Sequence, residues 1–66
     1  MEIRVNGKLR DVADGLTVRQ LLDSFQLHPM RVAVQVNEEI IKRDRFGEVK
    51  LKPGDTVEIL TMMAGG

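Results

Sequence analysis

The chain ends in Ala64-Gly65-Gly66, and the terminal α-carboxylate is the group in this sequence best suited to chemistry. Because glycine has no Cβ, two consecutive glycines can lie extended in a channel that is too narrow for any side chain. The carboxylate of Gly66 is ionised at neutral pH. We therefore expect the reactive group to be the C-terminus itself, inserted into the active site of another protein. Chemically idle glycines at a terminus are also common, so the remainder of the chain has to separate these two interpretations.

Other residue types offer weaker candidates for a reactive site. The sequence contains no cysteine, so it has neither a thiol nucleophile nor a disulfide. His28 is the only histidine, and without cysteine nearby it makes a poor metal ligand, so we expect no metal site. The basic residues Lys42, Arg43 and Arg45 and the adjacent pair Glu38-Glu39 are interpreted as solvated surface.

Length and composition limit the possible functions. Sixty-six residues indicate one domain, and a domain of this size has little room for an enclosed active site. No apolar run is long enough to cross a membrane, and the first residues lack the apolar core of a signal peptide, so we expect a cytoplasmic protein. Ten basic residues balance ten acidic ones, and only two residues are aromatic, which argues against nucleic-acid binding.

The first half of the chain predicts a hairpin followed by a helix. Residues 2–5 alternate between polar and apolar, and Asn6-Gly7 favours a type I′ turn into a returning strand over 8–12. Thr17 and Gln20 have the spacing of a capping box at the start of a helix. We expect this helix to end near Gln26, because Pro29 disfavours helical geometry just before it.

The second half predicts three further strands. In order, we expect a strand over 31–36, a turn at 37–39, a short strand at 40–41, an irregular segment over 42–47, a tight turn at 53–55 and a last strand over 56–62. The fold class is therefore α+β, a β-grasp fold with a mixed sheet of four to five strands and one main helix on one face. Its expected core consists of Ile3, Val5, Val32, Val34, Val36, Val57 and Ile59, with the bulk of Phe25 and Phe46.

Alternation along the last strand also predicts what faces away from the helix. If Val57 and Ile59 point inward, Leu60 and Met62 lie on the open face of the sheet, and Ala33 lies there too. Apolar residues beside the C-terminal segment suggest a docking patch for a partner. Isolated exposed apolar residues are also ordinary.

The ordered set of motifs resembles the ThiS family, the small sulfur carriers of thiamin thiazole biosynthesis. Two positions depart from the family pattern, with Phe46 where relatives often have Trp and Lys42 where many have Pro. The matching features, in chain order, are Val5-Asn6-Gly7, Leu16-Thr17-Val18 with Leu21-Leu22, Val32-Ala33-Val34 with Asn37, Arg43 before Phe46, Leu51 with Gly54-Asp55, Val57-Glu58-Ile59 and Gly65-Gly66.

This resemblance implies a division into a β-grasp domain over 1–62 and a flexible tail over 63–66 that ends in Gly-Gly. It implies that Gly66 is adenylated by a ThiF-like partner of the ubiquitin-activating type and then converted to a thiocarboxylate. ATP and Mg²⁺ would be used by that partner, and this chain would bind no cofactor. Sulfur would come from a cysteine desulfurase or another persulfide donor and pass to a ThiG-like thiazole synthase. The residues expected to contact partners are Gly65, Ala64, Met63, Met62, Leu60 and Ala33.

In this interpretation the protein is a carrier and co-substrate without catalytic residues of its own, so it is not an enzyme. Because the chain has no cysteine, the sulfur would have to be held on the terminal carbonyl. Two alternatives stay open at the level of sequence. One is the small subunit of molybdopterin synthase, which shares the Gly-Gly end and the chemistry. The other is a non-catalytic β-grasp interaction or modifier module.

Overall fold

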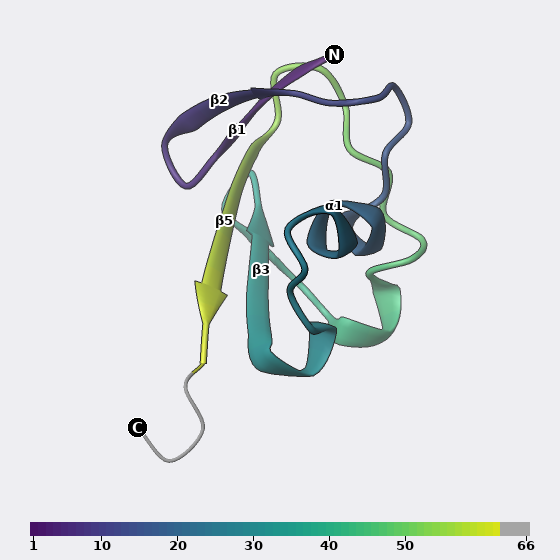
Figure 1. Ribbon diagram of the computed structural model, residues 1–66, viewed down its shortest axis with the longest axis vertical. Coiled ribbons are helices and arrows are strands. Elements are labelled where there is room, and N and C mark those ends of the chain that lie inside the picture. The colour runs from purple at the N-terminus through teal and green to yellow at the C-terminus, as the bar shows by residue number, and fades with distance from the viewer. Residues whose placement is uncertain (63–66) are drawn as a thin grey trace.

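The computed structural model describes residues 1–62, and the predicted tail over 63–66 lies outside that range. The elements are β1 (Glu2–Val5), β2 (Lys8–Asp11), α1 (Val18–Ser24), η1 (Pro29–Arg31), β3 (Val32–Val36), β4 (Glu39–Ile41), η2 (Arg43–Arg45) and β5 (Thr56–Thr61). The strands form one sheet in the order β2-β1-β5-β3-β4, and α1 lies on one side of it (Figure 1). The β1–β5 pair is parallel, and the other pairs are antiparallel. The predicted mixed sheet with one helix is confirmed.

Two-residue turns close both hairpins of the sheet. Asn6 and Gly7 have φ angles of 49° and 83°, which fits the predicted type I′ turn. Asn37 and Glu38 form a second turn of the same kind, with φ angles of 50° and 71°. Glycine is the usual residue at the second position of such a turn, so Glu38 holds a conformation that is strained for an L side chain.

The helix begins as the sequence predicts. The amide of Gln20 donates to the Thr17 hydroxyl oxygen at 3.1 Å, and the Thr17 amide donates to Gln20 Oε1 at 2.9 Å, which completes the capping box. Val18, Leu21 and Leu22 are fully buried and form the face that packs on the sheet. The capped first turn therefore fixes which side of α1 meets the core.

The end of the helix differs from the prediction. The helix stops at Ser24, and Gln26 takes a left-handed conformation with φ of 59°. The amide of Leu27 then donates to the Leu22 carbonyl at 2.9 Å, which is a Schellman arrangement. Pro29 is not the cause of the helix end, because it starts the separate 3₁₀ turn η1.

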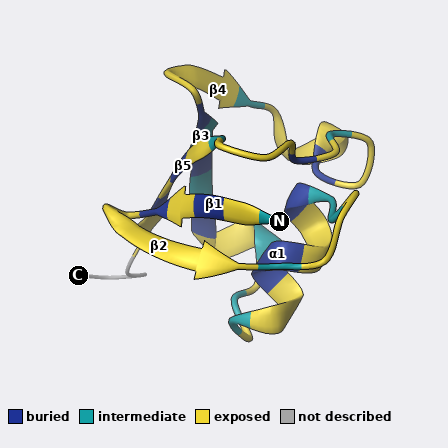
Figure 2. Ribbon diagram, turned by 90° about the horizontal axis from the view of Figure 1, so that it is seen from above, coloured by how far each residue is buried: buried dark blue, intermediate teal, exposed yellow. Residues whose placement is uncertain are grey.

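The core lies between α1 and the inner face of the sheet, where the buried segments gather in Figure 2. All seven inner-face strand residues predicted from alternation are buried, and so is Phe46. Phe25 is only partly buried, and its ring lies against the Arg10 guanidinium at 5.1 Å. Leu51 was not predicted as core, yet it is buried because its amide bonds to the Leu16 carbonyl at 2.8 Å and holds the segment beside the helix entrance.

Strand boundaries shift by one residue in several places. The strand β2 ends at Asp11, before the predicted Val12, and β3 begins at Val32 instead of Arg31. The strand β4 includes Glu39, and β5 ends at Thr61, one residue before the predicted end. The irregular segment over 42–47 contains the short turn η2.

Replacing Glu38 by glycine is expected to raise the free energy of unfolding by about 0.5–1 kcal/mol. The left-handed conformation costs a non-glycine residue roughly 1–2 kcal/mol, and the greater freedom of glycine in the unfolded chain offsets part of the gain. Urea unfolding of the two proteins measures the difference. Glu39→Gly is the matched control within β4 and is expected to destabilise the fold. An unchanged or lower midpoint for Glu38→Gly would contradict the strain argument.

Candidate functional site

The strand β5 positions whatever follows it in the chain. It runs between β1 and β3 in the middle of the sheet, and its end leads to residues 63–66 (Figure 1). The predicted reactive residue Gly66 and the predicted partner-binding residues Gly65, Ala64 and Met63 lie outside the described residues. The site can therefore be built from its base, which is the end of β5 and Met62.

Hydrogen bonds hold this base from both sides. On the β3 side, the Met62 amide donates to the carbonyl of Arg31 at 2.7 Å, one residue beyond the β3–β5 register. On the β1 side, the Asn6 side chain accepts a bond from the Ile59 amide at 2.7 Å and donates one to the Ile59 carbonyl at 3.2 Å. The last strand is thus fixed in place almost to the end of the described chain.

The open face of the sheet carries the predicted apolar patch. Ala33 and Leu60 are directly opposite each other in the β3–β5 register, so their side chains share one face. Leu60 is 64% exposed, and Met62, just past the strand, is 50% exposed. Sequence reasoning placed Ala33 and Leu60 on this face correctly.

Ile40 belongs to the same face and was missed. It pairs with Gln35 in the β3–β4 register, and Gln35 pairs with Glu58 of β5, which alternates with Leu60. Its side chain is 77% exposed. The alternation of Ile40 with the half-buried Ile41 was the signal that could have found it. We call Ala33, Ile40, Leu60 and Met62 the docking face.

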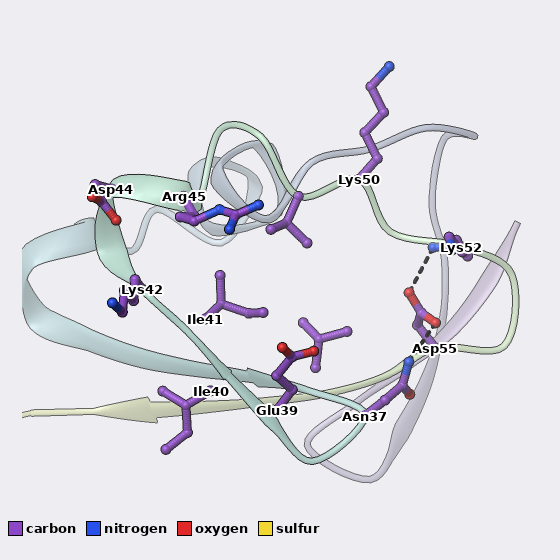
Figure 3. A pocket seen from close by; sticks show the side chains of 12 residues that line it. Asn37, Glu39, Ile40, Ile41, Lys42, Asp44, Arg45, Lys50, Lys52 and Asp55 are labelled. Carbon is purple, nitrogen blue, oxygen red and sulfur yellow. Dashed lines mark hydrogen bonds between the residues drawn. The ribbon is translucent and has the colours of Figure 1, made fainter.

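A groove of about 560 Å³ lies between β4 and the segment that leads into the 52–55 turn, and Ile40 of the docking face is among its lining residues (Figure 3). Lys42, Arg45 and Asp44 line it together with other groups of both signs. The Asp55 carboxylate in this groove is held by the Asn37 side chain at 2.9 Å and by the Lys52 amide at 2.8 Å. These contacts are structural, and the groove is separate from the end of β5.

The weaker sequence candidates have structural contacts as well. His28 is exposed, and its Nδ1 accepts a bond from the Met30 amide at 3.1 Å, which caps η1. Arg43 donates to the Pro29 carbonyl at 2.9 Å, and Arg45 forms an exposed ion pair with Glu48 at 3.2 Å. Among residues 1–62 no group of His, Asp and Glu is placed to hold a metal ion. No helix in this range is long and apolar enough to span a membrane.

Comparison with known proteins gives the same family over almost the whole chain. The family model described as the ThiS family matches residues 3–66. The sulfur carrier protein ThiS of Bacillus subtilis is 38% identical over 65 residues, which cover 97% of this chain and 98% of that protein. A thiazole synthase of Paramagnetospirillum magneticum is 32% identical over all 66 residues, and the chain spans about a fifth of its length, 20%.

A solved structure agrees with the sequence comparison. The crystal structure of the thiamine biosynthesis protein ThiS from Geobacter metallireducens superposes with a TM-score of 0.85 at 38% identity, with all of both chains covered. The shared fold includes the mixed five-stranded sheet and single helix described above. Because the family model extends to the final Gly65-Gly66 and the fold agrees from end to end, the chain belongs to the ThiS family.

Proposed function

We propose that this protein is a sulfur carrier that delivers sulfur for formation of the thiazole ring in thiamin biosynthesis. The observation that carries the proposal is the similarity to the sulfur carrier protein of Bacillus subtilis over nearly the full length of both chains. The names of the relatives favour the thiazole pathway over the molybdopterin alternative. In this function the chain is a co-substrate of other enzymes, and we place it in the cytoplasm.

The chemistry proceeds on the Gly66 carboxylate in two stages. A carboxylate does not exchange oxygen for sulfur unaided, so it first attacks the α-phosphorus of ATP on an adenylating partner, and pyrophosphate leaves. Mg²⁺ on that partner offsets the charge on the phosphates. A persulfide sulfur then attacks the carbonyl carbon and displaces AMP. A thiol then attacks the donor's sulfur atom and breaks the sulfur–sulfur bond, so the donor leaves as a disulfide with that thiol. The thiocarboxylate that remains has a sulfur that is a stronger nucleophile than the original oxygen.

The folded domain supplies the binding energy that four terminal residues cannot. Fixing the backbone of residues 63–66 costs about 1–2 kcal/mol for each residue, or roughly 4–8 kcal/mol in total. Of these four residues, only Met63 has a side chain larger than a methyl group, so the segment offers few contacts to offset this cost. The adenylating partner therefore has to hold the folded part, and the docking face is the exposed apolar surface nearest to the end of β5.

Two further partners complete the proposal. A thiazole synthase is the proposed acceptor, and it is supported by the thiazole synthase that contains a region similar to this entire chain. A cysteine desulfurase or another persulfide donor is the proposed source of sulfur. These roles require the carrier to leave one partner and meet the next, which suits an exposed docking face of modest size better than a permanent interface.

Deletion of Gly66 is expected to abolish sulfur loading, because the shortened chain carries its terminal carboxylate on Gly65, one residue short of the position that the partner adenylates. The protein is incubated with ATP, Mg²⁺, cysteine, a cysteine desulfurase and the adenylating partner, and its intact mass is measured. The full chain should gain the mass of one oxygen replaced by sulfur, and the truncated chain should stay unchanged. Conjugates on target lysines would show a protein modifier instead. Equal loading of both chains would exclude Gly66 as the carrier.

Substitution Leu60→Glu is expected to weaken docking without unfolding the domain. Its side chain is exposed, so the free energy of unfolding should change by less than about 0.5 kcal/mol. The KM for adenylation should rise about tenfold, because a buried charge would replace an apolar contact at the interface. Leu9→Glu is the matched control, since Leu9 is 57% exposed on the same open face but lies on β2, at the opposite edge of the sheet from Ile40. A wild-type KM for Leu60→Glu would remove Leu60 from the interface, and an equal rise in KM for Leu9→Glu would extend the interface across the whole open face.

A further inference from the structure

Asparagine side chains from the two hairpin turns hold β5 at two points along its length. Near its start, Asn37 Oδ1 accepts a bond from the Thr56 amide at 2.9 Å, and its Nδ2 donates to Asp55 at 2.9 Å. Near its end, Asn6 binds both backbone groups of Ile59. The two contacts are alike in chemistry but lie at the first and the fourth of the six residues of the strand.

The Asn6 side chain takes the place of backbone that β1 is too short to provide. The main chain of β1 pairs with β5 only at Arg4–Thr56 and Val5–Val57, and the chain then reverses at the Asn6-Gly7 turn. The Asn6 amide still donates to the Val57 carbonyl at 2.9 Å. Beyond that bond, the side-chain amide offers Ile59 the same acceptor and donor that a peptide group of a longer β1 would offer.

This contact is partly buried, and it joins residues 53 positions apart in the sequence. Without it, β5 after Val57 would have backbone neighbours only in β3 and the preceding Arg31. A strand end that is paired on one side frays more readily than one that is paired on both. The bonds to Asn6 therefore set how firmly the last described residues are held.

We propose that Asn6 is a positioning residue, which fixes the end of β5 and thereby the place where residues 63–66 begin relative to the docking face. The proposal rests on the proposed function, because it concerns delivery of the terminal carboxylate to the adenylating partner. A partner that grips the docking face finds Met62, the last described residue, already held. When the two bonds from the Asn6 side chain to Ile59 are lost, the partner has to order the end of β5 during binding, which raises KM more than it lowers kcat.

A simpler role for Asn6 would be to favour the turn, since asparagine tolerates positive φ. The variant Asn6→Gly separates the two roles. Glycine accepts this conformation at least as well, so the turn is kept while both side-chain bonds to Ile59 are lost. The matched control is Asn37→Gly, which makes the same change at the same position of the other turn. It removes the side-chain bond to the Thr56 amide at the start of β5.

The experiment compares the wild type and the two variants in two assays. Hydrogen exchange followed by NMR should show the Ile59 amide exchanging about tenfold faster in Asn6→Gly, as expected for the loss of its bond, with little change in Asn37→Gly. Kinetics of adenylation should show KM rising about three- to tenfold in Asn6→Gly, with kcat within about twofold. Asn37→Gly should leave KM near the wild-type value even where it lowers stability equally.

Unchanged exchange at Ile59 in Asn6→Gly would overturn the proposal, and so would equal KM increases in both variants, which would reflect stability alone. Failure of the proposed function is seen separately, because the wild type would then gain no sulfur with an active partner. In that event the exchange comparison still decides whether Asn6 fixes the end of β5.

Discussion

The pairing of β5 between β1 and β3 is the interaction on which the remainder of the structure depends. It places the last strand at the centre of the sheet, where Val57 is fully buried and Ile59 nearly so. Because β1 and β5 run in parallel, the first hairpin and the last strand of the chain become neighbours. The residues that lead into the C-terminal segment are consequently part of a strand that is paired on both sides.

The size of the domain is consistent with a proposed function that uses the C-terminus and one face of the sheet. All of the fully buried residues are apolar, and they pack α1 and the segment around Leu51 against one side of the sheet. No polar side chain among residues 1–62 is buried. The other side of the sheet is left to solvent, and there Ala33, Ile40 and Leu60 are available to a partner without any loss to the core.

Predictions from the sequence were correct for features that depend on residues close together in the chain. The Asn6-Gly7 turn, the Thr17–Gln20 capping box and the inward valines of β3 all follow from contacts within a few residues, and all are present. The helix ends at Ser24, within two residues of the predicted position, but the expected cause was wrong. Gln26 adopts a left-handed conformation that closes a Schellman motif, and no glycine marks it. Phe25 was placed too deep because its ring lies at the helix end, where Arg10 from β2 covers it.

The sequence by itself determined the fold class, the family and the residue proposed to react. Strand alternation, turn residues and the terminal glycines each involve only residues that are close together in the sequence. It also placed Ala33 and Leu60 on one face, since strand alternation needs no knowledge of neighbours. Only the tertiary structure brought Asn6 to Ile59, added Ile40 to the docking face and buried Leu51. Each of these depends on which strands lie side by side, and that order is set by long-range packing that no short stretch of sequence specifies.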